Sequence, residues 1–131
     1  MFMGALKFEK EYEFNASRRM LFPYLSTAGG LSQWFADDVT IDEDKIFRFV
    51  WEGDIHRAKL VAQRVNSYVK FEFIDDKIEG DLAYTEIKLD ENELTQTIFL
   101  KIFDFSDIED PDEAHELWDH LIQNLKEIVG G

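Results

Sequence analysis

The histidines are the side chains in this sequence whose chemistry and spacing can be judged first. His115 and His120 lie five positions apart on a predicted helix, which separates them by about 140° around the helix axis. A helical zinc pair needs histidines four positions apart on one face, so we interpret both as solvated surface and predict no metal site. His56 falls on the inward face of a predicted strand. It either makes a local hydrogen bond or orients a ligand within an apolar pocket.

Acidic residues gather ahead of the same helix, at Asp104, Asp107, Glu109, Asp110, Asp112 and Glu113. The run lacks the glycine and the ligand spacing of an EF-hand calcium loop, and helix capping with solubility explains it more simply. The chain has no cysteine and no clear serine–histidine pairing. A nucleophilic triad therefore has no support, and we predict neither catalytic residues nor a cofactor.

Aromatic residues are the most informative excess, since they make up 15% of the chain. Six of them fall on predicted inward faces or short helices, namely Trp34, Phe49, Trp51, Phe71, Phe73 and Trp118. They form either an ordinary core or a ligand pocket that also contains polar groups such as His56 or Lys10. The small side chains of Ala58 and Ala62 could leave space for such a pocket, or let a helix approach closely. The candidate ligand-binding residues are these six aromatics together with His56 and Leu121.

Size and charge limit the classes of function. A chain of 131 residues has the length of one domain, and we predict a single domain over residues 1–131. The net charge of -14 repels phosphate backbones and anionic bilayers, so we expect no nucleic-acid partner. No apolar run reaches the roughly 18 residues that span a bilayer, and residues 1–7 lack the apolar stretch of a signal peptide. We expect a cytoplasmic protein without membrane insertion.

The first part of the chain must supply one strand and two short helices. Period-two alternation predicts a strand over residues 6–14, with Lys10 as its one polar inward residue. Helical spacing predicts a short helix over residues 18–25, limited or kinked by Pro23. A second short helix after Thr27 carries Leu31, Trp34 and Phe35.

Residues 39–105 are patterned almost entirely as strands. Turns or solvated loops are predicted at residues 52–54, 66–67, 75–81 and 90–93. The last predicted strand covers residues 94–105 and is apolar on both faces from Ile98 to Phe103. Strands joined by such short turns are antiparallel neighbours.

The C-terminal helix has the clearest boundaries. Asp110 is a good N-cap, Pro111 suits the first helical position, Glu113 completes a capping-box pattern and Gly130 can end the helix. Its apolar stripe is about 140° wide and contains Ala114, Leu117, Trp118, Leu121, Ile122, Leu125, Ile128 and Val129. The economical arrangement is an α+β helix-grip fold, in which a curved antiparallel sheet of about six to seven strands wraps around this helix.

This order of elements resembles the START-like, or SRPBCC, superfamily, which includes the birch-pollen-allergen fold. Within it, the chain is most similar to the group of homologues of the activator of Hsp-ninety ATPase. The resemblance rests on Leu31-Ser32-Gln33-Trp34-Phe35, on the strand motifs Phe47-Arg48-Phe49 and Tyr68-Val69-Lys70-Phe71-Glu72-Phe73, on residues 94–105, and on the helix from Leu117-Trp118 to Leu125. It implies a cavity between the long helix and the sheet that holds small apolar molecules.

Three functions stay open on these grounds. The first is non-catalytic binding of a small apolar or lipid-like molecule in that cavity. The second is a co-chaperone-like interaction module, with a homodimer or a protein partner bound through Phe99 and Phe103. The third is a cyclase-type enzyme on a cyclic apolar substrate, with His56 as its acid or base.

Overall fold

A computed structural model describes residues 6–78, 80–108 and 110–131 of the chain. In chain order its elements are β1 (Leu6–Phe14), α1 (Arg18–Ser26), α2 (Ala28–Leu31), β2 (Asp38–Ile41), β3 (Phe47–Trp51), β4 (Asp54–Arg64), β5 (Tyr68–Ile78), β6 (Asp81–Asn92), β7 (Thr97–Ser106) and α3 (Pro111–Val129). Residues 1–5, the side chain of Leu6, Glu79 and Glu109 lie outside the description. The expectations drawn above from the start of the chain, from Leu6 and from Glu109 are therefore not addressed by it.

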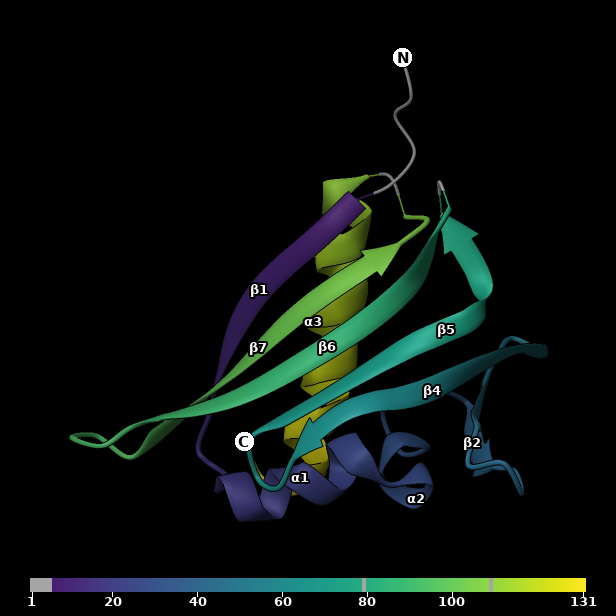
Figure 1. Ribbon diagram of the computed structural model, residues 1–131. Helices are drawn as coiled ribbons and strands as arrows, with labels where there is room; N and C mark the ends of the chain where they lie inside the picture. The colour runs from purple at the N-terminus through teal and green to yellow at the C-terminus, as the bar shows by residue number, and fades with distance from the viewer. Residues whose placement is uncertain (1–5, 79, 109) are drawn as a thin grey trace.

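The seven strands form one antiparallel sheet in the order β1-β7-β6-β5-β4-β3-β2. Figure 1 shows α3 crossing one face of this curved sheet, with α1 and α2 beside the end of α3 where the chain finishes. This is the predicted α+β helix-grip arrangement, which is thereby confirmed. No helix in the described part of the chain is long and apolar enough to cross a membrane.

Alternation along the strands decides which side chains face α3. On β6 and β7 the inward positions are Ala83, Thr85, Ile87 and Leu89 and, opposite them, Ile98, Leu100, Ile102 and Asp104, all of them buried. The β3–β4 hairpin turns at Glu52 and Gly53, whose φ angles of 51° and 86° are those of the tight turn that matches strand twist. The predicted turn at this position is confirmed.

The predicted loop over residues 75–81 is wrong for most of its length. β5 continues to Ile78 and β6 starts at Asp81, with a register shift between Phe73 and Lys77. The acidic composition of this stretch suggested solvent, but the backbone still pairs with β6 while extra residues bulge out of the ladder. Such a bulge bends a strand and redirects its side chains, and here it carries Asp75 and Asp76.

The hairpin between β6 and β7 also differs from the expectation. β6 extends to Asn92 and β7 begins at Thr97, so the turn lies between them rather than over residues 90–93. Asn92 accepts hydrogen bonds from the backbone N–H of Leu94 and Thr95 through its side-chain oxygen. The turn with this Asx-type bonding lies three residues later than the run of acids predicts.

The two short helices pack closely because Gly30 has no side chain. A Cβ on Gly30 would lie 2.2 Å from the carbonyl oxygen of Pro23. Pro23 itself lies inside α1 rather than ending it. α2 stops at Leu31, so Trp34 and Phe35 are not on the predicted second helix; they follow it in a hydrogen-bonded turn and are both buried.

The boundaries of α3 match the prediction. The side chain of Asp110 accepts a hydrogen bond from the N–H of Asp112, Pro111 begins the helix, and Gly130 ends it with a φ of 86°. The stripe is buried less widely than predicted, because Leu117 and Ile128 are 41% and 37% exposed. The sheet covers the centre of the stripe and leaves its edges open.

Candidate functional site

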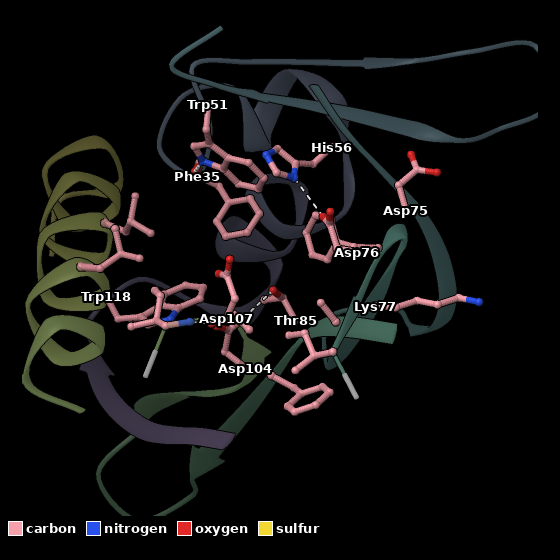
Figure 2. Close-up of a pocket in the computed structure, with 18 of the residues that line it drawn as sticks. Phe35, Trp51, His56, Asp75, Asp76, Lys77, Thr85, Asp104, Asp107 and Trp118 are labelled. Atoms are coloured by element: carbon pink, nitrogen blue, oxygen red, sulfur yellow. Dashed lines mark hydrogen bonds and ion pairs between the residues drawn. The ribbon is translucent and has the colours of Figure 1, made fainter. Parts of the chain in front are cut away.

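An open cavity of about 680 Å³ lies between α3 and the inner face of the sheet. Five aromatic residues from five segments contribute to its wall, namely Phe35, Trp51, Phe73, Phe105 and Trp118. Figure 2 shows Trp118 entering from α3, opposite Trp51 and Phe35. Leu117 and Leu121, at the edge of the α3 stripe, also line it.

Five of the eight predicted ligand-binding residues line this cavity, namely Trp51, His56, Phe73, Trp118 and Leu121. Trp34, Phe49 and Phe71 are packed in the core instead, with exposures of 4%, 0% and 1%. Trp34 Nε1 donates to the Tyr24 carbonyl of α1, and the rings of Phe49 and Phe71 meet edge-on at 5.4 Å on the inner face of the sheet. Ala58 is likewise fully buried, and the small side chains that line the cavity are on β6, namely Ala83 and Thr85.

Lys10 has a different role from that of a pocket residue. Its Nζ donates a hydrogen bond of 2.7 Å to Oδ1 of Asp119 on α3, and Tyr12 Oη donates to the same oxygen at 2.7 Å. These donors lower the pKa of Asp119, and burial with the Asp119 contact raises the pKa of Tyr12. The inward lysine of β1 therefore attaches α3 to the edge of the sheet.

A histidine and an aspartate form a pair at the exposed side of the cavity, which we call its mouth. His56 Nδ1 is 2.9 Å from Oδ2 of Asp76, and its ring meets Trp51 edge-on at 5.4 Å. In the tautomer with the proton on Nδ1, the ring donates to Asp76 and leaves Nε2 able to accept from a ligand. The hydrogen bond expected of His56 is present and the ring also lines the cavity, so the role of orienting a ligand stays a prediction.

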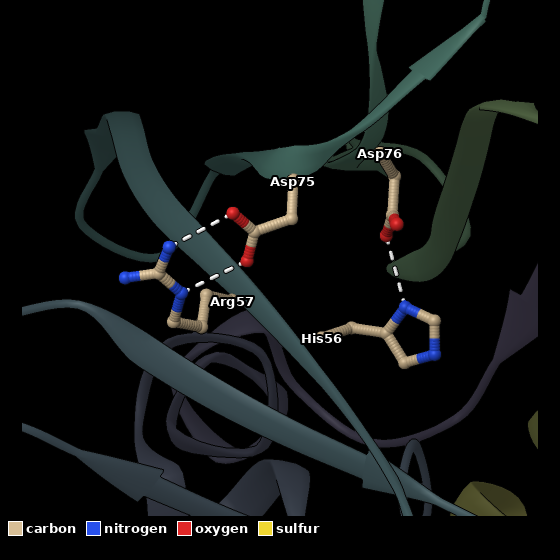
Figure 3. A network of polar contacts seen from close by, with 4 residues as sticks. All are labelled: His56, Arg57, Asp75 and Asp76. Atoms are coloured by element: carbon tan, nitrogen blue, oxygen red, sulfur yellow. Dashed lines mark hydrogen bonds and ion pairs between the residues drawn. The ribbon is translucent and has the colours of Figure 1, made fainter.

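A second carboxylate at the mouth is neutralised by an arginine. Arg57 donates to both carboxylate oxygens of Asp75 at 2.8 Å, through Nε and Nη2. Figure 3 shows this pair beside His56 and Asp76, with both acids on the bulged part of β5. Hydrogen bonding by Arg57 lowers the pKa of Asp75. The bidentate geometry fixes the bulge that also supplies the partner of His56.

The inner part of the cavity contains a buried acid. Thr85 Oγ1 donates a 2.7 Å hydrogen bond to Oδ1 of Asp104, which is only 9% exposed. Burial raises the pKa of Asp104, and the neighbouring donors Thr85, Ser106 and Trp118 oppose that rise. Helix capping and solubility therefore do not explain Asp104, as they do Asp110, and that part of the interpretation of the acidic run is wrong. Alternation with Ile98, Leu100 and Ile102 could have placed Asp104 inward.

Trp118 is close to the same carboxylate without bonding to it in good geometry. The indole Nε1 is buried and has no hydrogen-bond partner among the described residues, although it is near enough to Asp104 to favour its ionised form. Figure 2 shows the indole nitrogen on the side of the ring that faces Asp104. A buried donor without a partner is costly and therefore informative.

The remaining histidines lie apart from the cavity. His115 and His120 are both exposed on α3, and the ring of His115 meets Phe8 edge-on at 4.9 Å. Within the described residues, no three His, Cys, Asp or Glu side chains come together in a way that could hold a metal ion.

The lining of the cavity is strongly acidic. Its charged residues are one lysine, Lys77, and five acids, namely Glu52, Asp75, Asp76, Asp104 and Asp107. Arg57 compensates Asp75, and His56 is the partner of Asp76. The cavity thus combines an aromatic wall with an electrostatic preference against anions.

Comparisons with known proteins agree with this architecture. BfR322 from Bacteroides fragilis is 39% identical over 96% of this chain and 92% of that chain, with a TM-score of 0.64. The Aha1 dimer from Colwellia psychrerythraea is 18% identical, with coverages of 95% and 96% and a TM-score of 0.73. XoxI from Bacillus cereus is 14% identical, with coverages of 97% and 96% and a TM-score of 0.73. The search among curated proteins gave no match.

The family model that matches describes a START-like superfamily domain and spans residues 3–131. That match covers nearly the whole chain, and the fold it implies is the one observed. The chain therefore belongs to the START-like superfamily.

Proposed function

We propose that this protein binds a small apolar molecule, without catalysis, in the cavity between α3 and the sheet. The observation that carries the proposal is the cavity itself, about 680 Å³ in volume with aromatic side chains from separate elements in its wall. Ligand sites of small molecules have volumes of roughly 300–1,000 Å³ and are lined mainly by apolar and aromatic groups with a few polar ones. Membership of the START-like superfamily supports the same function.

Filling the cavity should abolish the binding. Ala83 is 7% exposed and lies opposite Phe73 at the cavity wall, so Ala83→Leu would place three extra carbon atoms where the ligand lies. We expect the variant to bind the neutral dye Nile red at least about tenfold more weakly. The added side chain would displace part of the dye, and the dye would then bury about two methylene groups' worth less of its apolar surface. Dye fluorescence titration measures this directly.

The matched control is Ala62→Leu, the same substitution on β4 at a half-buried site outside the cavity lining. It should leave dye affinity unchanged, and circular dichroism should report the same fold for both variants. Equal dye binding by Ala83→Leu, Ala62→Leu and the unmodified protein would contradict the proposal, since the dye would then be bound elsewhere.

A co-chaperone-like interaction module is the second candidate. It is supported by the likeness to the Aha1 dimer and by Phe99 and Phe103, which are half-buried on the outer face of β7. Lysines partly cover that face, because Nζ of Lys88 and of Lys101 lie 5.2 and 5.5 Å from the centre of the Phe103 ring.

Sedimentation velocity tests this candidate. A dimer that Phe103→Ser disperses would favour it, and a monomer at every concentration would remove the homodimer.

A cyclase-type enzyme is the third candidate, with His56 as its acid or base. The Asp76 contact holds the ring in a fixed orientation, as a general base requires. The argument for an enzyme is weaker than the argument for binding. It rests on one partly exposed pair, His56 and Asp76, and it identifies no substrate group that would react. We therefore retain non-catalytic binding as the function that the geometry supports best.

A further inference from the structure

The inner end of the cavity contains two polar groups whose hydrogen-bonding capacity is not used up. Trp118 Nε1–H is a donor without a partner among the described residues, in a side chain that is 2% exposed. Beside it, the Asp104 carboxyl accepts from Thr85, and an ionised carboxylate has room for further donors. A donor and an acceptor thus lie side by side in the wall of this open cavity, among aromatic residues and near a further acid, Asp107.

A purely structural role explains only part of this arrangement. The Thr85–Asp104 hydrogen bond links β6 to β7 at paired positions, but the same strands are already paired along the whole ladder. The Thr85–Asp104 hydrogen bond also leaves the Trp118 indole donor unpaired. If the position of Asp104 served packing alone, an apolar residue there would avoid the cost of burying an acid. Buried polar groups that cost stability and line a cavity are typical of sites that orient a ligand.

We propose that this inner end recognises the hydroxyl group of an otherwise apolar ligand, with Trp118 Nε1–H donating to the hydroxyl oxygen and Asp104 accepting from the hydroxyl hydrogen. The inference rests on the proposed function and specifies its ligand class. A hydroxyl is the smallest neutral group that is both donor and acceptor, so it satisfies both side chains at once. The apolar part of the ligand then lies along Trp51, Phe73 and Leu121, toward the mouth.

Other head groups leave at least one of the two side chains unsatisfied. A carboxylate accepts from Trp118 but places a second negative charge beside Asp104, in a cavity lined by five acids and one lysine. An ammonium donates to Asp104 but offers nothing to the indole N–H. An ether accepts from the indole but cannot donate to Asp104. The ammonium leaves the indole N–H without a partner, the ether leaves Asp104 with only its hydrogen bond from Thr85, and the carboxylate adds repulsion. Each of these mismatches lowers affinity.

A set of four probes with the same octyl chain tests the assignment. The compounds are 1-octanol, 1-methoxyoctane, octylamine and octanoate, each titrated against Nile red bound to the full chain at neutral pH. We expect 1-octanol to displace the dye at a concentration about five- to tenfold lower than any other probe, the difference made by one extra buried hydrogen bond. Octanoate should be the weakest.

Trp118→Phe gives a second, independent readout, because it removes the indole donor and keeps an aromatic ring. The preference for 1-octanol over octylamine should largely disappear in this variant. Trp34→Phe is the matched control, since Trp34 is also buried but its Nε1 already donates to the Tyr24 carbonyl at 2.8 Å outside the cavity. This control should keep the preference.

The indole N–H signals in a proton–nitrogen NMR spectrum report the contact itself. The Trp118 signal is identified by its loss in Trp118→Phe. It should move downfield on addition of 1-octanol, as expected for a donor that gains an acceptor, and should not do so with octylamine.

The outcomes separate the two proposals. If all four probes displace the dye but octanoate, octylamine or 1-methoxyoctane binds as tightly as 1-octanol, the hydroxyl assignment is overturned and binding in the cavity stands. If Trp118→Phe keeps the full preference for 1-octanol, the role of the indole is overturned. If neither Nile red nor any probe binds, both proposals fail together.

Discussion

Replacing Phe49 with alanine should lower the free energy of unfolding by about 3–5 kcal/mol, the range for large aromatic truncations in a core. Phe49 is fully buried, and its ring contacts those of five other aromatic residues at centroid distances of 5.4 to 6.0 Å, namely Phe35, Phe47, Trp51, Phe71 and Phe73. Alanine would leave a cavity at the centre of this cluster. Urea denaturation followed by far-ultraviolet circular dichroism measures the loss.

Phe99→Ala is the matched control, because Phe99 is half-buried on the outer face of β7. It should cost about 1 kcal/mol, since less surface returns to water and no enclosed void forms. A loss at Phe49 no larger than the loss at Phe99 would show that Phe49 is not central to the core. The milder variant Phe49→Leu is expected to remain folded and to bind Nile red normally, which separates a core residue from the cavity-lining Trp51 and Phe73.

Replacing Asp104 with asparagine should stabilise the protein at neutral pH by an amount on the order of 2 kcal/mol, the scale on which burying a charged group costs free energy. Burial raises the pKa of Asp104 above its ordinary value of 3.8. A raised pKa means that the folded state binds the proton more tightly than the unfolded state does. The contribution of Asp104 to the free energy of unfolding is thus fully present below about pH 4, where the carboxyl is protonated in both states. It is lost as the pH rises through the pKa that Asp104 has in the folded protein.

The difference between the two proteins should therefore vanish in acid and grow toward neutral pH. Asparagine keeps the shape and an oxygen that can accept from Thr85, but it cannot ionise. Thermal unfolding over a pH series measures the effect. If Asp104→Asn is the less stable protein at neutral pH, the hydrogen bonds to the carboxylate outweigh its desolvation, and the account of Asp104 as a costly group is wrong.

Asp119→Asn should change stability in the opposite direction to Asp104→Asn in the same thermal unfolding experiment. Hydrogen bonds from Lys10 and Tyr12 lower the pKa of Asp119, so its contribution is present above its ordinary pKa and is lost as the pH falls through the lowered folded value. The asparagine variant should be the less stable protein at neutral pH, and its deficit should shrink in acid. The two substitutions together distinguish a buried acid that costs stability from an exposed acid that supplies it.

Elements with local signals were predictable from the sequence. The boundaries of α3 follow from Asp110, Pro111 and Gly130, which act on the backbone within one helical turn. β1 and the β3–β4 hairpin follow from alternation and from a turn in which Gly53 adopts a positive φ. The bulge in β5 was missed, because acidic composition indicates solvent exposure but does not say whether a backbone is paired.

The candidate site was only partly predictable, for the reason that burial on one face does not distinguish a core from a cavity. Phe49, Phe71 and Phe73 have the same alternation and all point inward, but only Phe73 lies where the edge of α3 leaves space. Asp104 lies among acids in the sequence, and its burial depends on pairing with Thr85 across two strands. The neighbourhood of Trp118 and Asp104 likewise requires α3 to be docked.

From its sequence alone, this protein is determined to have a long amphipathic helix, a run of antiparallel strands and a net charge of -14. Those properties depend on residue type and on spacing along the chain, which act locally or over the whole surface. The tertiary structure alone decided where the packing stays incomplete and which polar side chains face that space. Both depend on how an α-helix crosses a bent sheet, and thus on contacts between segments that are distant in sequence.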